Sequence, residues 1–222
     1  MKRANRRLAW HGEPMNEAAL AEAIRGAQRG DATSFDSLVG AYAPRLFGFL
    51  FRLTGSRQES EDLLQEVFLR LVRMIEAYTH DGRFDAWLFR IAANLVRDRV
   101  RKVRRTGKFV SGSGADGDDG AGSLIESVEA AEPEVERGLV MSEELDALNR
   151  ALAQLPEAER EVIMLRHFSQ MSFKEIAEAT EVPLGTALAR GHRGLEKLRR
   201  LMASDAESDV RTARRERSAA RG

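Results

Sequence analysis

The chain has 222 residues, of which 43% are apolar and 32% charged, with 35 basic and 35 acidic side chains. It contains no cysteine, which excludes a disulfide framework, a cysteine zinc site and a thiol nucleophile. Because it has neither a signal-peptide core nor an apolar run long enough to cross a bilayer, we expect a cytoplasmic protein without a membrane span. The abundance of alanine, leucine, arginine and glutamate favours an all-α fold.

Charge is strongly segregated along the chain. Residues 90–108 hold eight basic side chains against one acid, and residues 185–201 hold five against one. Between them, residues 111–146 hold eleven acids against one arginine. Blocks of like charge repel internally and attract partners of opposite sign. Charge alone leaves two interpretations open, binding surfaces or merely solvated helix faces.

The first predicted helices lie within residues 16–54, where apolar residues recur at helical spacing. After Thr54 and Gly55, Ser56 and Glu59 have the spacing of a capping box, which predicts a helix over about residues 57–77. Its acidic face is expected to carry Glu59, Asp62 and Glu66. Its buried face is expected to comprise Leu63, Leu64, Val67, Phe68, Leu71, Val72 and Ile75.

A second strongly periodic helix is predicted from Phe84 to about Arg105, after a loop at residues 79–82. Its apolar face includes Trp87, which we expect to pack in the core. Asn94, Asp98 and Arg101 are spaced to share the outer face, with Arg90 and Arg97 beside them. Asp98 is expected to pair with Arg101 or Arg97 within the helix.

The middle of the chain divides it into two helical domains. Residues 106–123 are rich in glycine, serine and aspartate and cannot bury enough surface to fold. We therefore predict an N-terminal extension (1–15), a helical domain (16–105), a flexible acidic linker (106–139), a second helical domain (140–202) and a disordered basic tail (203–222).

The second domain has the pattern of a helix-turn-helix. Leucines at helical spacing predict a helix that ends at Pro156. A capping box at Ser172 and Glu175 opens a short helix, and Pro183 opens a basic helix that runs to about Leu201. Two short helices joined by a tight turn, the second one basic, are typical of DNA-binding proteins. Periodicity alone does not distinguish them from helical hairpins that bind nothing.

Together these motifs resemble the extracytoplasmic-function (ECF) group of bacterial RNA polymerase sigma factors. Residues 16–105 resemble sigma domain 2 and residues 140–202 resemble sigma domain 4. The motifs that carry the resemblance are residues 60–68 (SEDLLQEVF), the Phe-x-x-Trp-Leu-x-x-Ile-Ala-x-Asn pattern of residues 84–94, Leu155-Pro156-Glu157 with Arg160, residues 172–178 (SFKEIAE) and residues 183–186 (PLGT).

The resemblance implies that the helix from Phe84 contacts the −10 promoter element. Asn94 would contact a base through its amide, and Arg90, Arg97 and Arg101 would hold phosphates. The loop before the helix would help to capture a flipped base, with His80 and Asp81 as candidates. For Asn94 and His80 the alternative is an ordinary surface side chain.

The resemblance also implies protein partners. Asp62, Gln65 and Glu66 would dock on the β′ clamp helices of core RNA polymerase, and the second domain would meet the β flap. An anti-sigma factor is a further expected partner, because members of the group are commonly held inactive by one.

The basic helix departs from the family pattern. Leu188 and Ala189 replace DNA-facing polar residues, and Gly191 and Gly194 replace core residues. Leu188 would either touch a thymine methyl group or pack inward if the helix is rolled. The residues expected to contact the −35 element are Thr186, Arg190, His192, Arg193 and Lys197.

These features predict an alternative sigma factor that is not an enzyme and needs no cofactor or metal. The four histidines are scattered, and no nucleophile or phosphate-loop motif is present. Two alternatives stay open, a stand-alone helix-turn-helix regulator and a sigma-like decoy. The sequence identifies neither the promoters, nor the anti-sigma factor and its signal, nor a role for either terminus.

Overall fold

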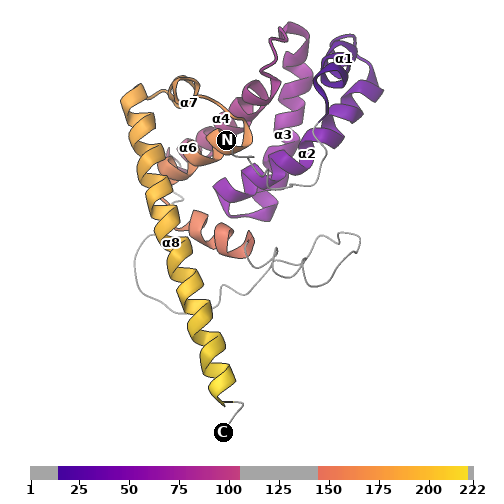
Figure 1. The fold of residues 1–222 in the computed structure, drawn as a ribbon. Coiled ribbons are helices and arrows are strands. Elements are labelled where there is room, and N and C mark those ends of the chain that lie inside the picture. Colours follow the sequence, from indigo (N-terminus) through magenta and orange to yellow (C-terminus); the bar gives the residue numbers. More distant parts are fainter. Residues whose placement is uncertain (1–14, 106–144, 220–222) are drawn as a thin grey trace, which may run out of the picture.

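The computed structural model describes residues 15–105 and 145–219, and these residues form helices and short connections without a strand (Figure 1). The all-α prediction is confirmed for this part of the chain. The predicted linker (106–139) and residues 1–14 of the predicted extension lie outside the described residues.

The N-terminal bundle, residues 15–105, is built from helices whose starts are fixed by polar caps. Asn16 and Asp31 accept hydrogen bonds from the backbone at the starts of the first two helices, and Ser56 does so for the third. Phe49, Leu50 and Phe89 are buried at its centre. Its helices are α1 (Glu17–Gln28), α2 (Ala32–Thr54), α3 (Arg57–Met74) and α4 (Phe84–Arg105), with a 3-10 turn, η1 (Ile75–Ala77), after α3.

Helix α3 differs from its prediction in two places. Only half of the capping box forms. Ser56 Oγ accepts from the Glu59 N–H, but the Glu59 carboxylate does not bond to the Ser56 N–H. The Ser56 N–H instead donates to Thr54 Oγ1 at 3.2 Å, and the Glu59 carboxylate pairs with Arg99 at 3.3 Å. The assignment of Val72 to the buried face is wrong, because its side chain is 55% exposed beside Leu69, which is 52% exposed. A helical stripe is about 100° wide, and Val72 falls at its edge.

The C-terminal bundle, residues 145–219, contains the predicted helix-turn-helix. The capping box of Ser172 and Glu175 is complete, with each side chain bonded to the other residue's backbone N–H. The tail expected to be disordered from residue 203 is instead helical to Ala219, in a segment without proline or glycine and rich in strong helix formers. The helices are residues 145–153, α6 (Glu157–Phe168), α7 (Phe173–Thr180) and α8 (Leu184–Ala219).

Two glycines let α8 lie close against its neighbours. A Cβ atom on Gly191 would stand 2.5 Å from Phe173 Cε1, and one on Gly194 would stand 2.7 Å from Ile163 Cδ1. These contacts are too short for any larger residue without movement. Leu188 meanwhile is 45% exposed, so the helix is not rolled to bury it.

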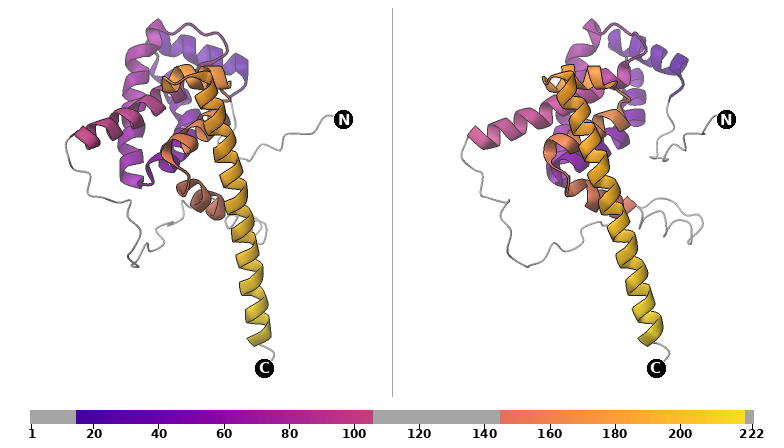
Figure 2. Two further views of the ribbon diagram at one scale, coloured as in Figure 1. Left: turned by 90° about the vertical axis from the view of Figure 1, so that its left-hand side faces the viewer. Right: turned by 60° about the vertical axis from the view of Figure 1, so that its left-hand side comes forward.

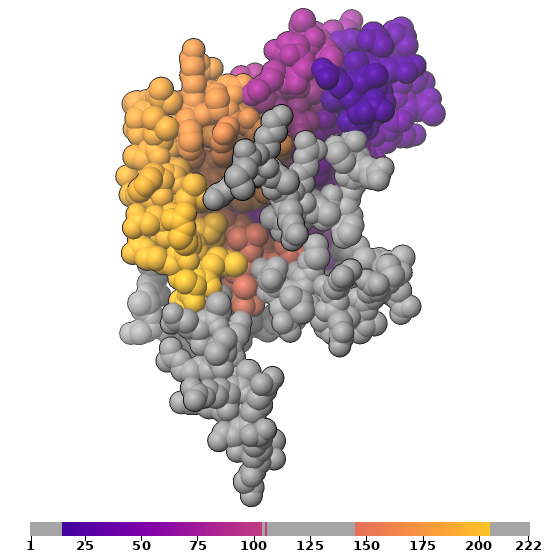
Figure 3. Space-filling view, viewed as in Figure 1, coloured from indigo at the N-terminus to yellow at the C-terminus, as the bar shows by residue number. Residues whose placement is uncertain are grey.

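The two bundles pack against each other, with α6 and α7 facing α2 and α4 (Figure 2). In the space-filling view the orange surface of the C-terminal bundle adjoins the magenta surface of the N-terminal bundle (Figure 3). The Phe168 ring lies 5.8 Å from that of Phe49 and 5.9 Å from that of Phe89. Beyond this contact the last part of α8 extends away from the body (Figure 1). No helix within residues 15–105 or 145–219 combines the length and the apolar character that a membrane span requires.

Candidate nucleic-acid interface

The outward face of α4 presents the polar side chains that its periodicity predicted. Asn94, Asp98 and Arg90 are exposed, and Arg101 Nη1 lies 3.8 Å from Asp98 Oδ1. The intrahelical pair is therefore Asp98 with Arg101, one of the two expected partners. An exposed pair of this kind contributes a few tenths of a kcal/mol at most. Arg101 Nη2 also lies 3.9 Å from Glu181 Oε2, just after α7.

Arg97 is placed differently from the other arginines of α4. Its Nε lies 3.3 Å from Glu161 Oε1 on α6, and the two side chains are only 16% and 13% exposed. Its Nη2 donates hydrogen bonds to Asn94 Oδ1 and to the Ala179 carbonyl of α7. Burial raises the pKa of Glu161, and the positive charge of Arg97 opposes that rise. Both Asn94 and Arg97 are thus engaged within the protein.

The loop before α4 is held by aromatic packing. The Tyr78 ring lies 4.5 Å from the Trp87 ring and 5.5 Å from the Phe84 ring. Burial, with the nearby Asp81 and Asp85 carboxylates, raises the pKa of Tyr78 to about 12. His80 Nδ1 lies 3.4 Å from the Tyr78 hydroxyl. The half-buried Trp87 packs among these rings, in keeping with its expected role.

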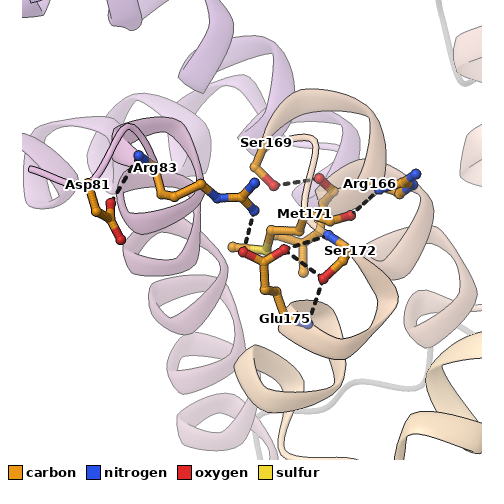
Figure 4. A network of polar contacts seen from close by, with 8 residues as sticks. Asp81, Arg83, Arg166, Ser169, Met171, Ser172 and Glu175 are labelled. Atoms are coloured by element: carbon orange, nitrogen blue, oxygen red, sulfur yellow. Dashed lines mark hydrogen bonds and ion pairs between the residues drawn. The ribbon is translucent and has the colours of Figure 1, made fainter.

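A cavity of about 240 Å³ opens between this loop and the C-terminal bundle. Asp81 and Arg90 both line it, so two of the predicted −10 residues are brought together, whereas His80 is not among its lining residues. Asp81 Oδ1 also accepts from the Arg83 N–H at 3.0 Å, and the Arg83 side chain donates to Glu175 of α7 (Figure 4). The remaining walls include Trp87, Met171 and Glu178.

A buried carboxylate, Glu159, holds two of the five residues expected to contact the −35 element. Its oxygens lie 3.1 Å from Arg193 Nε and 3.0 Å from Lys197 Nζ, and its side chain is 8% exposed. Burial alone would raise the pKa of Glu159, but the hydrogen bonds and charges of Lys197 and Arg193 together hold it below its usual value. Sequence reasoning missed Glu159, because no spacing rule links residues on two different helices.

The other predicted −35 residues are less constrained. His192 is exposed on α8, and Thr186 and Arg190 are half-buried. Arg190 is close enough to Glu161 for its charge to act on the pKa of that carboxyl group. The basic side of α8 therefore turns partly toward the carboxylates of α6, while the exposed side carries Leu188 and His192.

Helix α3 exposes a mixed polar and apolar face. Asp62 and Gln65 are exposed, and Glu66 is half-buried and pairs with Arg70 at 3.2 Å. Leu69 and Val72 continue the line of Gln65 along the helix, four and seven residues further on. The sequence did not predict this extension, because the helical pattern placed Val72 in the core.

Two family models match the chain, Sigma-70 region 2 over residues 38–106 and Sigma-70 region 4 over residues 145–198. The chain is also 31% identical over 184 residues to the ECF RNA polymerase sigma factor SigW of Bacillus subtilis, covering 83% of this chain and 97% of that protein.

The chain belongs to the ECF sigma factors.

This sigma factor is also 35% identical to the RNA polymerase sigma factor CarQ of Myxococcus xanthus, over 78% of its own length and 91% of CarQ. Its fold is similar to that of RpoE in complex with the anti-sigma factor NepR from Bartonella quintana, with a TM-score of 0.56 and 22% identity over 78% of this chain and 99% of the other. CnrH in complex with the cytosolic domain of CnrY gives a TM-score of 0.53 at 22% identity, over 84% of this chain and 99% of the other.

Proposed function

We propose that this protein is an alternative sigma factor, which binds core RNA polymerase, recognises −10 and −35 promoter elements and directs promoter opening. The observation that carries the proposal is the match to both sigma regions in one chain, together with 31% identity to SigW over 97% of that protein. The protein's contribution is binding energy rather than chemistry, so it acts without a cofactor and is not an enzyme.

Within this proposal, residues 16–105 act as sigma domain 2, residues 140–202 as sigma domain 4 and residues 106–139 as the linker between them. The N-terminal bundle supports the first assignment, because α3 and α4 expose two separate polar faces. The helix-turn-helix of α7 and α8 supports the second.

The −10 element binds along α4 and the loop before it. Arg90 and Arg101 hold phosphates, which gives affinity that falls with salt. Asn94 contacts a base edge, since an amide both donates and accepts. Asp81 supplies a polar group for the DNA from the wall of the 240 Å³ cavity. His80 is the neighbouring residue in the same loop. Arg97 joins this set once its contacts with the C-terminal bundle are released.

The −35 element binds along α8. Thr186, Arg190 and His192 are the direct contacts, and Leu188 adds an exposed apolar group that fits a thymine methyl. The side chains of Arg193 and Lys197 remain 55% and 39% exposed, so they add positive potential while Glu159 fixes their direction.

Core polymerase binds the face of α3. Asp62, Gln65 and Glu66 meet the β′ clamp helices, and Leu69 and Val72 extend the contact with apolar area. The C-terminal bundle meets the β flap. Because a structural neighbour was solved with an anti-sigma factor, we also propose an anti-sigma partner for this chain.

The test is in vitro transcription from genomic fragments with bacterial core polymerase and the purified chain. We expect transcripts that start at a shared −10 motif. They should be lost with Asn94→Ala and with Asp62→Ala plus Gln65→Ala, and kept with the remote exposed variant Asp36→Ala. Tight core binding without transcripts would favour a sigma-like decoy, and absence of core binding would favour a stand-alone DNA-binding regulator.

A further inference from the structure

Helix α1 contacts both ends of the loop before α4, which the proposed function assigns to base capture. At the end of α1, Gln28 Nε2 donates to the carbonyl oxygens of Ile75 and Tyr78, at 3.1 Å and 2.7 Å. At the start of α1, Glu17 lies near the turn of the loop, since a Cβ atom added to Gly82 would stand 3.9 Å from Glu17 Oε1. The loop is therefore supported from a helix that takes no part in the DNA face itself.

The two carbonyls that Gln28 binds lie where the chain leaves its helices. Ile75 is the C-cap residue of α3, and Tyr78 is the C-cap residue of η1. Carbonyl groups at a helix end have no acceptor role within the helix, so a side-chain donor can satisfy them. A primary amide carries two N–H donors on one nitrogen, which lets Gln28 bind both carbonyls at once. It thereby fixes the direction in which the chain enters the loop.

Gln28 is itself held firmly, because α1 packs tightly on α2. Ala27 beside it is buried, and a Cβ atom added to Gly26 would collide with the Ser34 hydroxyl of α2. Asp31, between the two helices, accepts a hydrogen bond of 3.0 Å from the Ser34 N–H. The two helices therefore act as one rigid support, and a group mounted on such a support is placed more precisely than one on a loop.

Tyr78 connects Gln28 with the residues that are proposed to contact the base. Its ring packs 4.5 Å from that of Trp87, and its hydroxyl lies 3.4 Å from His80 Nδ1. Tyr78 lines the 240 Å³ cavity together with Trp87 and Asp81. Groups that recognise a ligand must be held within about 0.5 Å of their working positions. A displaced Tyr78 backbone would therefore disturb several walls of this cavity together.

We propose that Gln28 is a positioning residue for base capture. Its amide sets the position of Tyr78, and through it that of His80 and Asp81, so it determines how strongly one base of the −10 element is preferred over the others. The contacts of α4 with phosphates do not depend on it. The inference rests on the proposed role of the loop in DNA binding. The match to Sigma-70 region 2 begins at residue 38, so Gln28 lies outside it.

The positioning itself is tested by amide hydrogen exchange of the full chain, read by mass spectrometry. Gln28→Met keeps an unbranched side chain of similar length and removes both donors. We expect exchange in residues 75–83 to become about tenfold faster, because the loop opens more often, and exchange in α2 and in the C-terminal bundle to change by less than about twofold. Unchanged exchange in residues 75–83 would overturn the inference, whatever the promoter measurements show.

A series of substitutions separates hydrogen bonding from packing. Gln28→Lys supplies donors again on a flexible side chain, whereas Gln28→Glu presents only acceptors to the two carbonyls. Exchange in residues 75–83 should therefore be slow with Gln28→Lys, faster with Gln28→Met and fastest with Gln28→Glu. Gln154→Met is the matched control at an exposed glutamine of the C-terminal bundle, and it should behave as the unmodified chain. Equal acceleration by Gln28→Lys and Gln28→Met would overturn the role given to the donors.

Base discrimination is the functional measurement, made with the chain bound to core polymerase. The probes are fluorescent single strands carrying the −10 motif found by transcription, in which each position in turn holds the other three bases or an abasic site. The unmodified chain should prefer one base about tenfold or more at one position. Gln28→Met should reduce this preference to about twofold, while affinity for the abasic strand stays within about twofold because phosphate contacts remain.

The outcomes distinguish this inference from the proposed function. An undiminished base preference in Gln28→Met would overturn the inference, and so would an equal loss of affinity for every strand, abasic strands included, because that pattern indicates general damage to the N-terminal bundle. Circular dichroism reports whether the helices are intact. Absence of any base preference in the unmodified chain would refute the −10 role of the loop, and with it the effect on DNA, even if the exchange of residues 75–83 responds to Gln28→Met.

Discussion

At the scale of single residues, Glu159 ties two helices of the C-terminal bundle together through its charge. It is buried at the start of α6 and faces two cations of α8. A buried carboxylate is tolerated only when its charge is compensated, and Arg193 and Lys197 provide that compensation. Glu159 therefore fixes how α8 is rotated against α6, and with it which side chains point outward.

The pKa of Glu159 predicts a pH dependence of stability. Because this pKa lies below the ordinary 4.5, ionised Glu159 stabilises the folded bundle above about pH 4.5, and the contribution is lost as the pH falls through the lowered pKa. Glu159→Gln should therefore lower the melting temperature most near neutral pH and progressively less in acid. Thermal unfolding followed by circular dichroism across this range measures it. The exposed variant Glu196→Gln should show no such trend, and a constant difference down to strong acid would contradict the assignment.

Gly191 constrains the packing of α8 by its lack of a side chain, because its neighbours leave no room for one. Glycine inside a helix ordinarily costs about 1 kcal/mol relative to alanine, so Gly→Ala is usually stabilising. At Gly191 the new methyl group would meet Phe173, and we expect Gly191→Ala to destabilise by about 1–3 kcal/mol. Gly185→Ala is the control, because nothing lies within 4 Å of its added methyl. Urea unfolding measures the free energy of unfolding of both variants. An equal increase in both would show that α8 can move away from Phe173 to admit the methyl group.

At the scale of elements, the sequence predicted best what is local. The caps of α7 depend on residues three positions apart, and the outer face of α4 depends on a repeat of about 3.6 residues. Val72 was misplaced because a position at the edge of a helical stripe is decided by which neighbours pack beside it. Glu159 with Arg193 is separated by 34 positions, and Arg97 with Ala179 by 82, so no local pattern predicted either contact.

Helix α3 offers a prediction about its exposed apolar pair. Changing Leu69 and Val72 to serine should weaken binding to core polymerase about tenfold or more, because both side chains would lose apolar area buried against the partner. The melting temperature should hardly change, since neither side chain is in the core. Binding of labelled protein to core polymerase measures the effect. Val39→Ser on α2, another exposed apolar position, should leave the affinity as it is. Unchanged affinity in the Leu69 and Val72 variant would confine the contact to the polar residues of α3.

At the scale of the whole molecule, the two bundles are joined by a contact of mixed character. Its exposed pairs, Arg83 with Glu175 and Arg101 with Glu181, are open to screening by salt, whereas Arg97 with Glu161 is largely shielded from solvent. The ring of Phe168 adds burial that salt does not weaken. The arrangement should therefore resist ionic strength better than a contact made of surface charges.

This resistance is measurable by small-angle X-ray scattering. Raising the salt concentration to about 0.5 M should leave the radius of gyration of the chain nearly unchanged, because the Debye length of a few ångströms matters only for exposed charges. Phe168→Ala should make the radius larger and dependent on salt. An unmodified chain that expands steadily with salt would show that the exposed pairs dominate the contact.

The length of α8 has a mechanical consequence. Its 36 residues make a rod of about 54 Å, rooted at the turn after α7 and extending past the body of the protein (Figure 1). A rotation of about 10° at the root therefore carries the far end through about 9 Å if the helix stays straight. Helix α8 therefore acts as a lever. A small tilt of the C-terminal bundle, with its internal packing unchanged, moves Ala219 by several ångströms.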